Sequence, residues 1–204
     1  MTVNAENKDP KSILLHVCCG PCAEWPVRVL QEEGYNLTAF FYNPNIHPLF
    51  EHDRRRDNAR LLMELRNVTF LEDDTYMEDQ WRGEAWTEKY PSRCAMCYDI
   101  RMRKTAEEAA RLGMHAFSTT LLVSPYQDHE AILTAATRAA AEYGVDFFYR
   151  DFRPGYREGQ NMAREDGLYR QKYCGCILSL DESKFRDKIY KDFEGSLGET
   201  RSVL

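Results

Sequence analysis

Seven cysteines, gathered in three tight groups, constrain this chain more than any other feature of its 204 residues. They lie in the segments CCGPC (18–22), RCAMC (93–97) and CGC (174–176). Cysteines that only fill a core are usually scattered, and an odd number in a reducing compartment does not suit a disulfide framework. The grouping predicts that the fold brings thiols from three distant segments to one metal centre.

Short apolar segments alternate with longer segments of helical pattern. We predict strands over 13–17, 36–42, 68–71, 115–119 and 145–149. We predict helices over 23–33, 51–65 and 93–112, one from Ser124-Pro125 to residue 143, a short helix with loop over 72–92, and mostly helix over 159–193. The alternation predicts an α/β fold: an open parallel sheet of about five strands with helices on both faces, Rossmann-like or HUP-like, with a helical C-terminal part.

Length and composition bound the organisation of the chain. We expect a disordered leader over 1–11 and a single α/β domain over 12–204 with a helical C-terminal extension. No apolar run approaches the ~20 residues of a membrane span, and the N-terminal residues lack the apolar core of a signal peptide, so we expect a cytoplasmic protein without a membrane partner. A net charge of -6 excludes a wholly basic surface but leaves room for a local basic patch.

The chemically rich segments follow the predicted strands, at the edge of a parallel sheet where ligands bind. In the loops NPNIHP (43–48) and TTLLVSPYQ (119–127), His47 and Tyr126 are candidate proton donors. Candidate substrate-binding residues in these loops are Asn43, Asn45, Thr119, Thr120 and Gln127. Two structural alternatives stay open: a capping loop with a solvated histidine, and a strand end followed by a helix cap at Ser124-Pro125.

Seven thiols exceed the four ligands of one structural zinc site. Four of them suit a 4Fe-4S cluster, and three then remain for a second metal, a redox disulfide or a persulfide. Structural zinc with spare buried cysteines and a CxxC dithiol oxidoreductase are the alternatives. Walker A, dinucleotide-binding and ATP-pyrophosphatase loop patterns are absent from the sequence, so ATP and NAD binding have no support from motifs.

Basic residues outnumber acidic ones over 53–60, 93–104 and 150–172. The last segment interleaves tyrosines with arginines, and such surfaces suit folded RNA. Arg153 and Arg157 in this segment are therefore candidate substrate-binding residues. A solvated helix face is the simpler explanation of such a charge run.

The order of several motifs resembles a known family. The segments LLHVCCGPCA, FFYNPNIHPLFEHDRRR, RCAMCYDIRMRKTA, FSTTLLVSPYQDHEAI and DFRPGYREGQNMAREDGLYRQKYCGCILS look like those of the cobalamin-independent, QueH-type epoxyqueuosine reductases. The resemblance covers about residues 11 to 180. It implies reduction of the epoxide of epoxyqueuosine, at the wobble position of a tRNA anticodon, to queuosine.

The resemblance also implies a cofactor and its ligands. Members of the family carry a 4Fe-4S cluster with an additional metal ion close by, which we expect to be iron. Cluster and metal ligands then come from Cys18, Cys19, Cys22, Cys94, Cys97, Cys174 and Cys176. Some members have aspartate at the position of Cys22, which is compatible with a role for this position in binding the extra metal.

The reaction consumes two electrons and two protons and releases water. Because no nicotinamide or flavin motif is visible, we expect the electrons to enter by a metal route from an external donor that the sequence does not identify. The anticodon loop of the tRNA is single-stranded, so its base is easily splayed out. The alternatives are an iron-sulfur dependent tRNA sulfur-transfer enzyme and a non-enzymatic zinc module that binds RNA.

Overall fold

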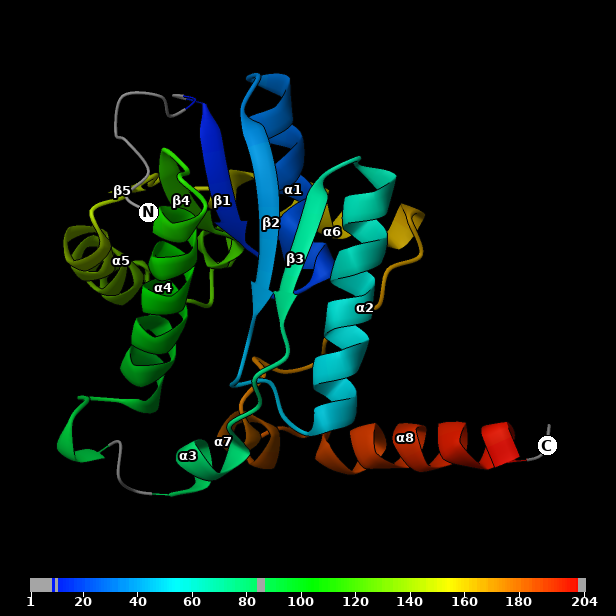
Figure 1. Cartoon of the computed structure of the whole chain (residues 1–204). Coiled ribbons are helices and arrows are strands. Elements are labelled where there is room, and N and C mark those ends of the chain that lie inside the picture. Colours follow the sequence, from blue (N-terminus) through cyan, green and yellow to red (C-terminus); the bar gives the residue numbers. More distant parts are fainter. Residues whose placement is uncertain (1–8, 10, 84–86, 202–204) are drawn as a thin grey trace.

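Five parallel strands form the centre of the computed structural model, which describes residues 9, 11–83 and 87–201, the last seven by their backbone (Figure 1). The strands are β1 (Ser12–His16), β2 (Asn36–Tyr42), β3 (Thr69–Asp73), β4 (Ala116–Thr119) and β5 (Asp146–Phe147). Their spatial order is β3-β2-β1-β4-β5, with β1 in the middle. The predicted five-stranded open parallel sheet is confirmed.

The helices divide between the two faces of the sheet. The first group, α1 (Gly20–Glu32), α2 (Leu49–Leu65) and α6 (Tyr156–Glu165), packs together on one face. The second, α4 (Arg93–Arg111) and α5 (His129–Tyr143), pack against each other and against the sheet. This split follows from strand order, because right-handed crossovers from β1 toward β3 and from β3 back to β4 fall on opposite faces.

Two sequence-based boundaries are wrong. The helix expected from Ser124-Pro125 begins at His129, because Asp128 caps it by accepting a hydrogen bond from the Ala131 amide at 3.0 Å. The preceding residues, Thr120–Val123, instead form the 3-10 helix η3. The strand expected over 145–149 is the two-residue β5, since only Ala116 and Phe117 of the short β4 are opposite it.

The core has two parts. The larger surrounds the central strand, in which Ile13, Leu14 and Leu15 are fully buried. The smaller gathers side chains of α3 (Glu78–Arg82), α4, α7 (Ile177–Asp181) and α8 (Arg186–Arg201), and includes Trp81 and two cysteines. Figure 1 shows α3, α7 and α8 beyond the carboxyl ends of the strands, so the smaller core closes the edge where the cysteine segments lie.

The other expectations on organisation have different outcomes. Of the predicted leader, residues 1–8 and 10 lie outside the described part, while the Asp9 carboxylate accepts a hydrogen bond from the Lys11 amide. A single domain from residue 12 stays a prediction. Within the described ranges, no helix has the length and apolarity needed to cross a bilayer.

Candidate metal centre

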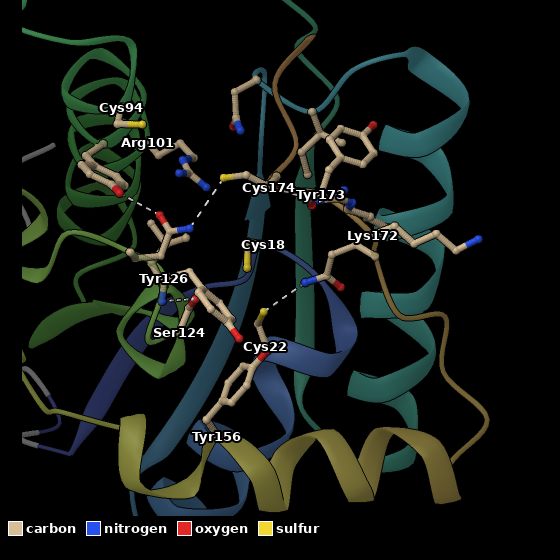
Figure 2. Close-up of a pocket in the computed structure, with 17 residues that line it drawn as sticks. Cys18, Cys22, Cys94, Arg101, Ser124, Tyr126, Tyr156, Lys172, Tyr173 and Cys174 are labelled. Carbon is tan, nitrogen blue, oxygen red and sulfur yellow. Dashed lines mark hydrogen bonds between the residues drawn. The ribbon is translucent and has the colours of Figure 1, made fainter. Parts of the chain in front are cut away.

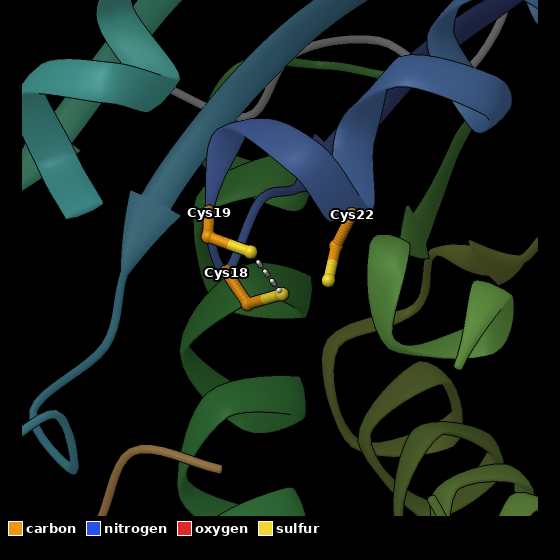
Figure 3. A group of neighbouring side chains, drawn as sticks. All are labelled: Cys18, Cys19 and Cys22. Carbon is orange, nitrogen blue, oxygen red and sulfur yellow. Dashed lines mark hydrogen bonds between the residues drawn. The ribbon is translucent and has the colours of Figure 1, made fainter. Parts of the chain in front are cut away.

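The thiols of Cys18, Cys19 and Cys22 form a compact triple at the start of α1. Their sulfur atoms all lie within 4.8 Å of one another, and the Cys18 and Cys19 sulfurs are 3.8 Å apart (Figure 3). It is the one group of three or more histidine, cysteine or acidic ligands this close among the described residues. Three converging soft donors suit a thiophilic metal such as iron or zinc.

Neighbouring strand ends hold the loop that carries this triple. The Thr120 hydroxyl accepts a hydrogen bond from the Cys18 amide at 3.2 Å and donates one to the Cys18 sulfur at 3.5 Å. The Asn43 amide group donates to the Val17 carbonyl at 2.9 Å. A Cβ at Gly20 would lie 3.0 Å from the Asn58 carbonyl oxygen, so glycine avoids a tight contact where α1 begins close to α2.

The three thiols differ in acidity. Interaction with the Cys19 thiol and then the Cys22 thiol lowers the pKa of Cys18 well below its ordinary value. The same interactions raise the pKa values of Cys19 and Cys22, with Cys18 as the leading cause for each. Cys18 is therefore the thiol of the triple whose thiolate form its neighbours stabilise.

The other four cysteines come from two helix starts. Cys94 and Cys97 are three residues apart at the beginning of α4, so both lie on one face of this helix. Cys176 caps α7 and accepts a hydrogen bond from the Ser179 amide at 3.4 Å, and Cys174 precedes it across Gly175.

Burial first, and then the Cys174 thiol, raises the pKa of Cys94. Burial also raises the pKa of Cys97 to about 12, and Cys174 and Cys176 act on it in the same direction. We refer to these four thiols as the second set.

A single cavity connects the cysteine groups. It has a volume of about 420 Å³ and is lined by Cys18 and Cys22 from the triple and by Cys94 and Cys174 from the second set (Figure 2). Cys97 and Cys176 are buried behind it, in the smaller core. The prediction that three distant thiol-bearing segments meet at one edge of the sheet therefore agrees with the geometry.

Three predicted substrate-binding or catalytic residues line the cavity. Tyr126 is 82% exposed, and its ring lies edge-on to Tyr156 with centroids 6.1 Å apart. Gln127 accepts a hydrogen bond from the Tyr98 hydroxyl at 2.7 Å and donates to the Cys174 sulfur at 3.6 Å. Asn45 is buried, and its side-chain oxygen has no hydrogen-bond partner in the described part of the chain.

His47 has a different environment from the one expected of a proton donor. It is fully buried and outside the cavity lining, not in a solvated loop. Its Nε2 donates to the Pro44 carbonyl at 3.0 Å, and its Nδ1 accepts from the Ile177 amide at 3.0 Å. Burial lowers the pKa of His47 to about 4. A neutral imidazole with both nitrogens hydrogen-bonded suits a residue that holds α7 against the loop 43–48. The expected catalytic role of His47 finds no support in these contacts.

The remaining predicted residues do not line the cavity. Thr119, like Asn43 and Thr120, is buried and organises the strand edge, since its hydroxyl donates to His16 Nδ1 at 2.9 Å. Arg153 is exposed and paired with Asp151 at 2.7 Å. Arg157 is exposed next to the cavity-lining Tyr156.

All seven cysteines are free thiols. A redox disulfide, one of the expected uses of the spare cysteines, therefore has no support.

Two buried arginines at the cavity were missed in the sequence. The Arg55 guanidinium pairs with Glu51 at 2.8 Å and donates to the Cys174 and Tyr173 carbonyls. Arg101 lies four residues after Cys97 on the same helix face, a spacing that could have indicated its position. No comparable signal marks Arg55, which lies far from the cysteines in sequence.

Comparison with known proteins agrees with this geometry. Residues 13–182 match the family described as Epoxyqueuosine reductase QueH. The chain belongs to the QueH family. It is 35% identical over 168 residues to the Epoxyqueuosine reductase QueH of Dehalococcoides mccartyi, covering 82% of this chain and 91% of that protein. The QueH of Thermotoga maritima is 35% identical over 181 residues, covering 85% of this chain and 92% of that one.

As a QueH family member, the chain is an oxidoreductase, and the resemblance noted in its sequence is confirmed. The sulfur-transfer alternative is not favoured by these QueH relatives. A solved structure of a predicted subunit of tRNA methyltransferase from Methanocaldococcus jannaschii is similar with a TM-score of 0.49 and 14% identity, over 75% of each chain.

Proposed function

We propose that this chain is a cytoplasmic enzyme that reduces the epoxide of epoxyqueuosine in tRNA to the alkene of queuosine. The observation that carries the proposal is that thiols of all three cysteine groups open onto one cavity, in a chain of the QueH family. In this reaction both C–O bonds of the epoxide break and a C=C bond forms. The oxygen leaves as water with two protons, and an external reductant supplies two electrons.

The donor set fits the cofactors expected for this chemistry. We assign Cys94, Cys97, Cys174 and Cys176 to a 4Fe-4S cluster, because the first and third line the cavity and the other two are buried in the smaller core. The compact triple of Cys18, Cys19 and Cys22 would hold a single iron ion beside it. When bound, the cluster would supply electrons one at a time and the iron ion a Lewis acid for the epoxide oxygen.

Residues of the chain itself would orient the substrate. The exposed ring of Tyr126 and the neighbouring Tyr156 offer a stacking surface for a base that is splayed out of the anticodon loop. Asn45 and Gln127 present polar groups to the cavity for the hydroxyl groups of the modified base. We assign the Tyr126 hydroxyl the role of a proton donor.

Two exposed arginines, Arg54 and Arg157, would hold the tRNA backbone. The Arg54 guanidinium stacks on the Tyr169 ring at 4.0 Å, and Arg157 follows the cavity-lining Tyr156. Neither makes an ion pair with a carboxylate in the described part of the chain, which leaves both free to bind phosphate. Arg153 is engaged by Asp151 and is the natural comparison.

The test is anaerobic turnover of epoxyqueuosine-containing tRNA by iron-reconstituted protein with a chemical reductant. Mass analysis of the nucleosides should show the loss of one oxygen, whereas replacement of oxygen by sulfur would overturn the proposal. Iron analysis and Mössbauer spectra should give more than four irons per chain. A colourless, zinc-only protein that is nevertheless active would refute the cofactor assignment. Arg157→Ala should raise KM for tRNA more than the matched control Arg153→Ala.

A further inference from the structure

Arg101 places a positive charge inside the cavity without a carboxylate partner. It projects from α4 into the cavity and is only 3% exposed (Figure 2). Its Nε donates to the Cys97 carbonyl at 3.3 Å, within its own helix. Among the residues that the structure describes, no carboxylate lies within ion-pair distance of its guanidinium, whereas the other buried cavity arginine, Arg55, pairs with Glu51.

The neighbours of Arg101 are thiols from both cysteine sets. Burial lowers the pKa of the guanidinium, but interactions with Cys97, then Cys18 and Cys174, raise it above its ordinary value. Both ring nitrogens of the nearby His16 are hydrogen-bonded, one to the Thr119 hydroxyl at 2.9 Å and the other to the Tyr42 carbonyl at 3.2 Å. Arg101 is therefore a buried cation without a carboxylate partner among the described residues, in a cavity lined by thiols of the compact triple and of the second set.

A buried charge is costly unless an opposite charge compensates it. Thiolates are the anions that this cavity can supply, and they are the ligand form of cysteine when a metal is bound. Because the guanidinium keeps its proton under all working conditions, its charge is constant. Adding an electron to a thiolate-bound centre increases its negative charge, and a fixed cation in a poorly solvated site favours the more negative state.

We propose that Arg101 is the counter-charge of the thiol-bound centre and raises the potential at which this centre accepts an electron from the external reductant. The inference rests on the proposed function, since it presupposes a bound iron-sulfur centre. It adds a positioning and tuning residue that belongs to no cysteine motif. A lysine at this position would keep the charge but lose the fork of guanidinium donors.

The experiment is a redox titration of the reconstituted full-length chain, followed by electron paramagnetic resonance. Arg101→Met should weaken the one-electron reduction equilibrium at least tenfold, which corresponds to a potential lower by about 59 mV. Arg101→Lys should stay within threefold of the unchanged chain. Arg103→Met is the matched control, because Arg103 lies on the same helix but faces solvent and pairs with Glu142. It should leave the potential unchanged.

Each outcome decides the inference. An unchanged potential in Arg101→Met, or an equal shift in Arg103→Met, overturns it. If the methionine variant does not fold by circular dichroism, Arg101→Gln is compared with Arg101→Lys instead. A folded Arg101→Gln variant that loses iron, while Arg101→Lys keeps it, supports the need for a charge at this position. Loss of iron from the lysine variant as well refutes it. A normal cluster and activity with no shift defeats only this inference, whereas no cluster in the unchanged chain defeats the cofactor assignment as well.

Discussion

Gly175 determines how the last two cysteines are presented. Its φ of +149° is one that residues with side chains rarely adopt, and a Cβ there would meet Ile46, Arg55 and Asn45 at 3.3–3.5 Å. Its carbonyl also accepts the His47 amide at 2.9 Å. The short turn between Cys174 and Cys176 therefore depends on glycine.

We predict that Gly175→Ala lowers the free energy of unfolding by about 1–3 kcal/mol and reduces the bound iron. Gly144→Ala is the control: its φ is also positive, at +62°, but no atom lies within 4 Å of an added Cβ. The control should be destabilised by about 1–2 kcal/mol with no loss of iron. Denaturant titration and iron analysis measure both effects, and full iron content in Gly175→Ala would contradict the prediction.

His47 predicts a pH dependence of stability. Its pKa in the folded protein is about 4, below the ordinary value of 6.5, because burial disfavours the imidazolium. Protonation of Nδ1 would also place a hydrogen opposite the Ile177 amide donor. A lowered pKa means that the contribution to stability is fully present above pH 6.5 and is lost as the pH falls toward 4, by about 3 kcal/mol in total.

The measurement is nitrogen NMR of histidine-labelled protein across this pH range. The neutral form with hydrogen on Nε2 should persist at pH 5, and unfolding free energies should fall between pH 6.5 and 4. A His47 ring that is already protonated at pH 6 would contradict the prediction that burial lowers its pKa.

At the scale of elements, the start of α5 shows that a helix-like composition and the side chain that caps the helix can lie at different residues. Ser124-Pro125 has the composition of a helix start, but its serine hydroxyl accepts a hydrogen bond from the nearby Tyr126 amide, at 3.2 Å. Asp128 is the residue whose side chain satisfies a first-turn amide, that of Ala131. The intervening residues stay outside the helix and line the cavity with Tyr126 and Gln127.

Asp128→Ala should therefore destabilise the protein by about 1 kcal/mol, within the usual range for loss of a helix cap. Ser124→Ala should cost less, because that hydroxyl serves a local turn. Urea denaturation of both variants gives the comparison, and a larger loss at Ser124 would show that the helix begins there.

At the scale of the molecule, the metal ligands divide between the two parts of the core: Cys19 and Cys22 lie in the larger part with the sheet, and Cys97 and Cys176 lie in the smaller part. The larger core surrounds β1, and the second cysteine set borders the smaller core around Trp81. The sheet therefore has enough apolar contacts to form before any metal binds.

We predict that chelation of the metal leaves a cooperatively folded sheet and loosens α7 and the start of α4. Hydrogen exchange by mass spectrometry should show faster exchange in these segments and unchanged protection in β1 and β2. Complete unfolding on metal removal would instead support the zinc module.

The sequence by itself determined the α/β class, the parallel sheet and the edge at which the cysteine segments meet. These follow from local pattern, because alternating strands and helices permit few topologies and place the loops after the strands at one edge. The length of β5 and the start of α5 were not predictable in this way, since partner strands and cap hydrogen bonds decide them.

Only the tertiary structure decided how the cysteines divide into two sets and which buried charges at the site have a partner. Spacing along the chain does not reveal that Cys18, Cys19 and Cys22 form a compact triple apart from the other four thiols. It also does not reveal that His47 is enclosed with both nitrogens bonded, or that Arg101 has no carboxylate partner among the described residues. Burial and charge compensation depend on which distant segments pack together, and that information is absent from any one segment.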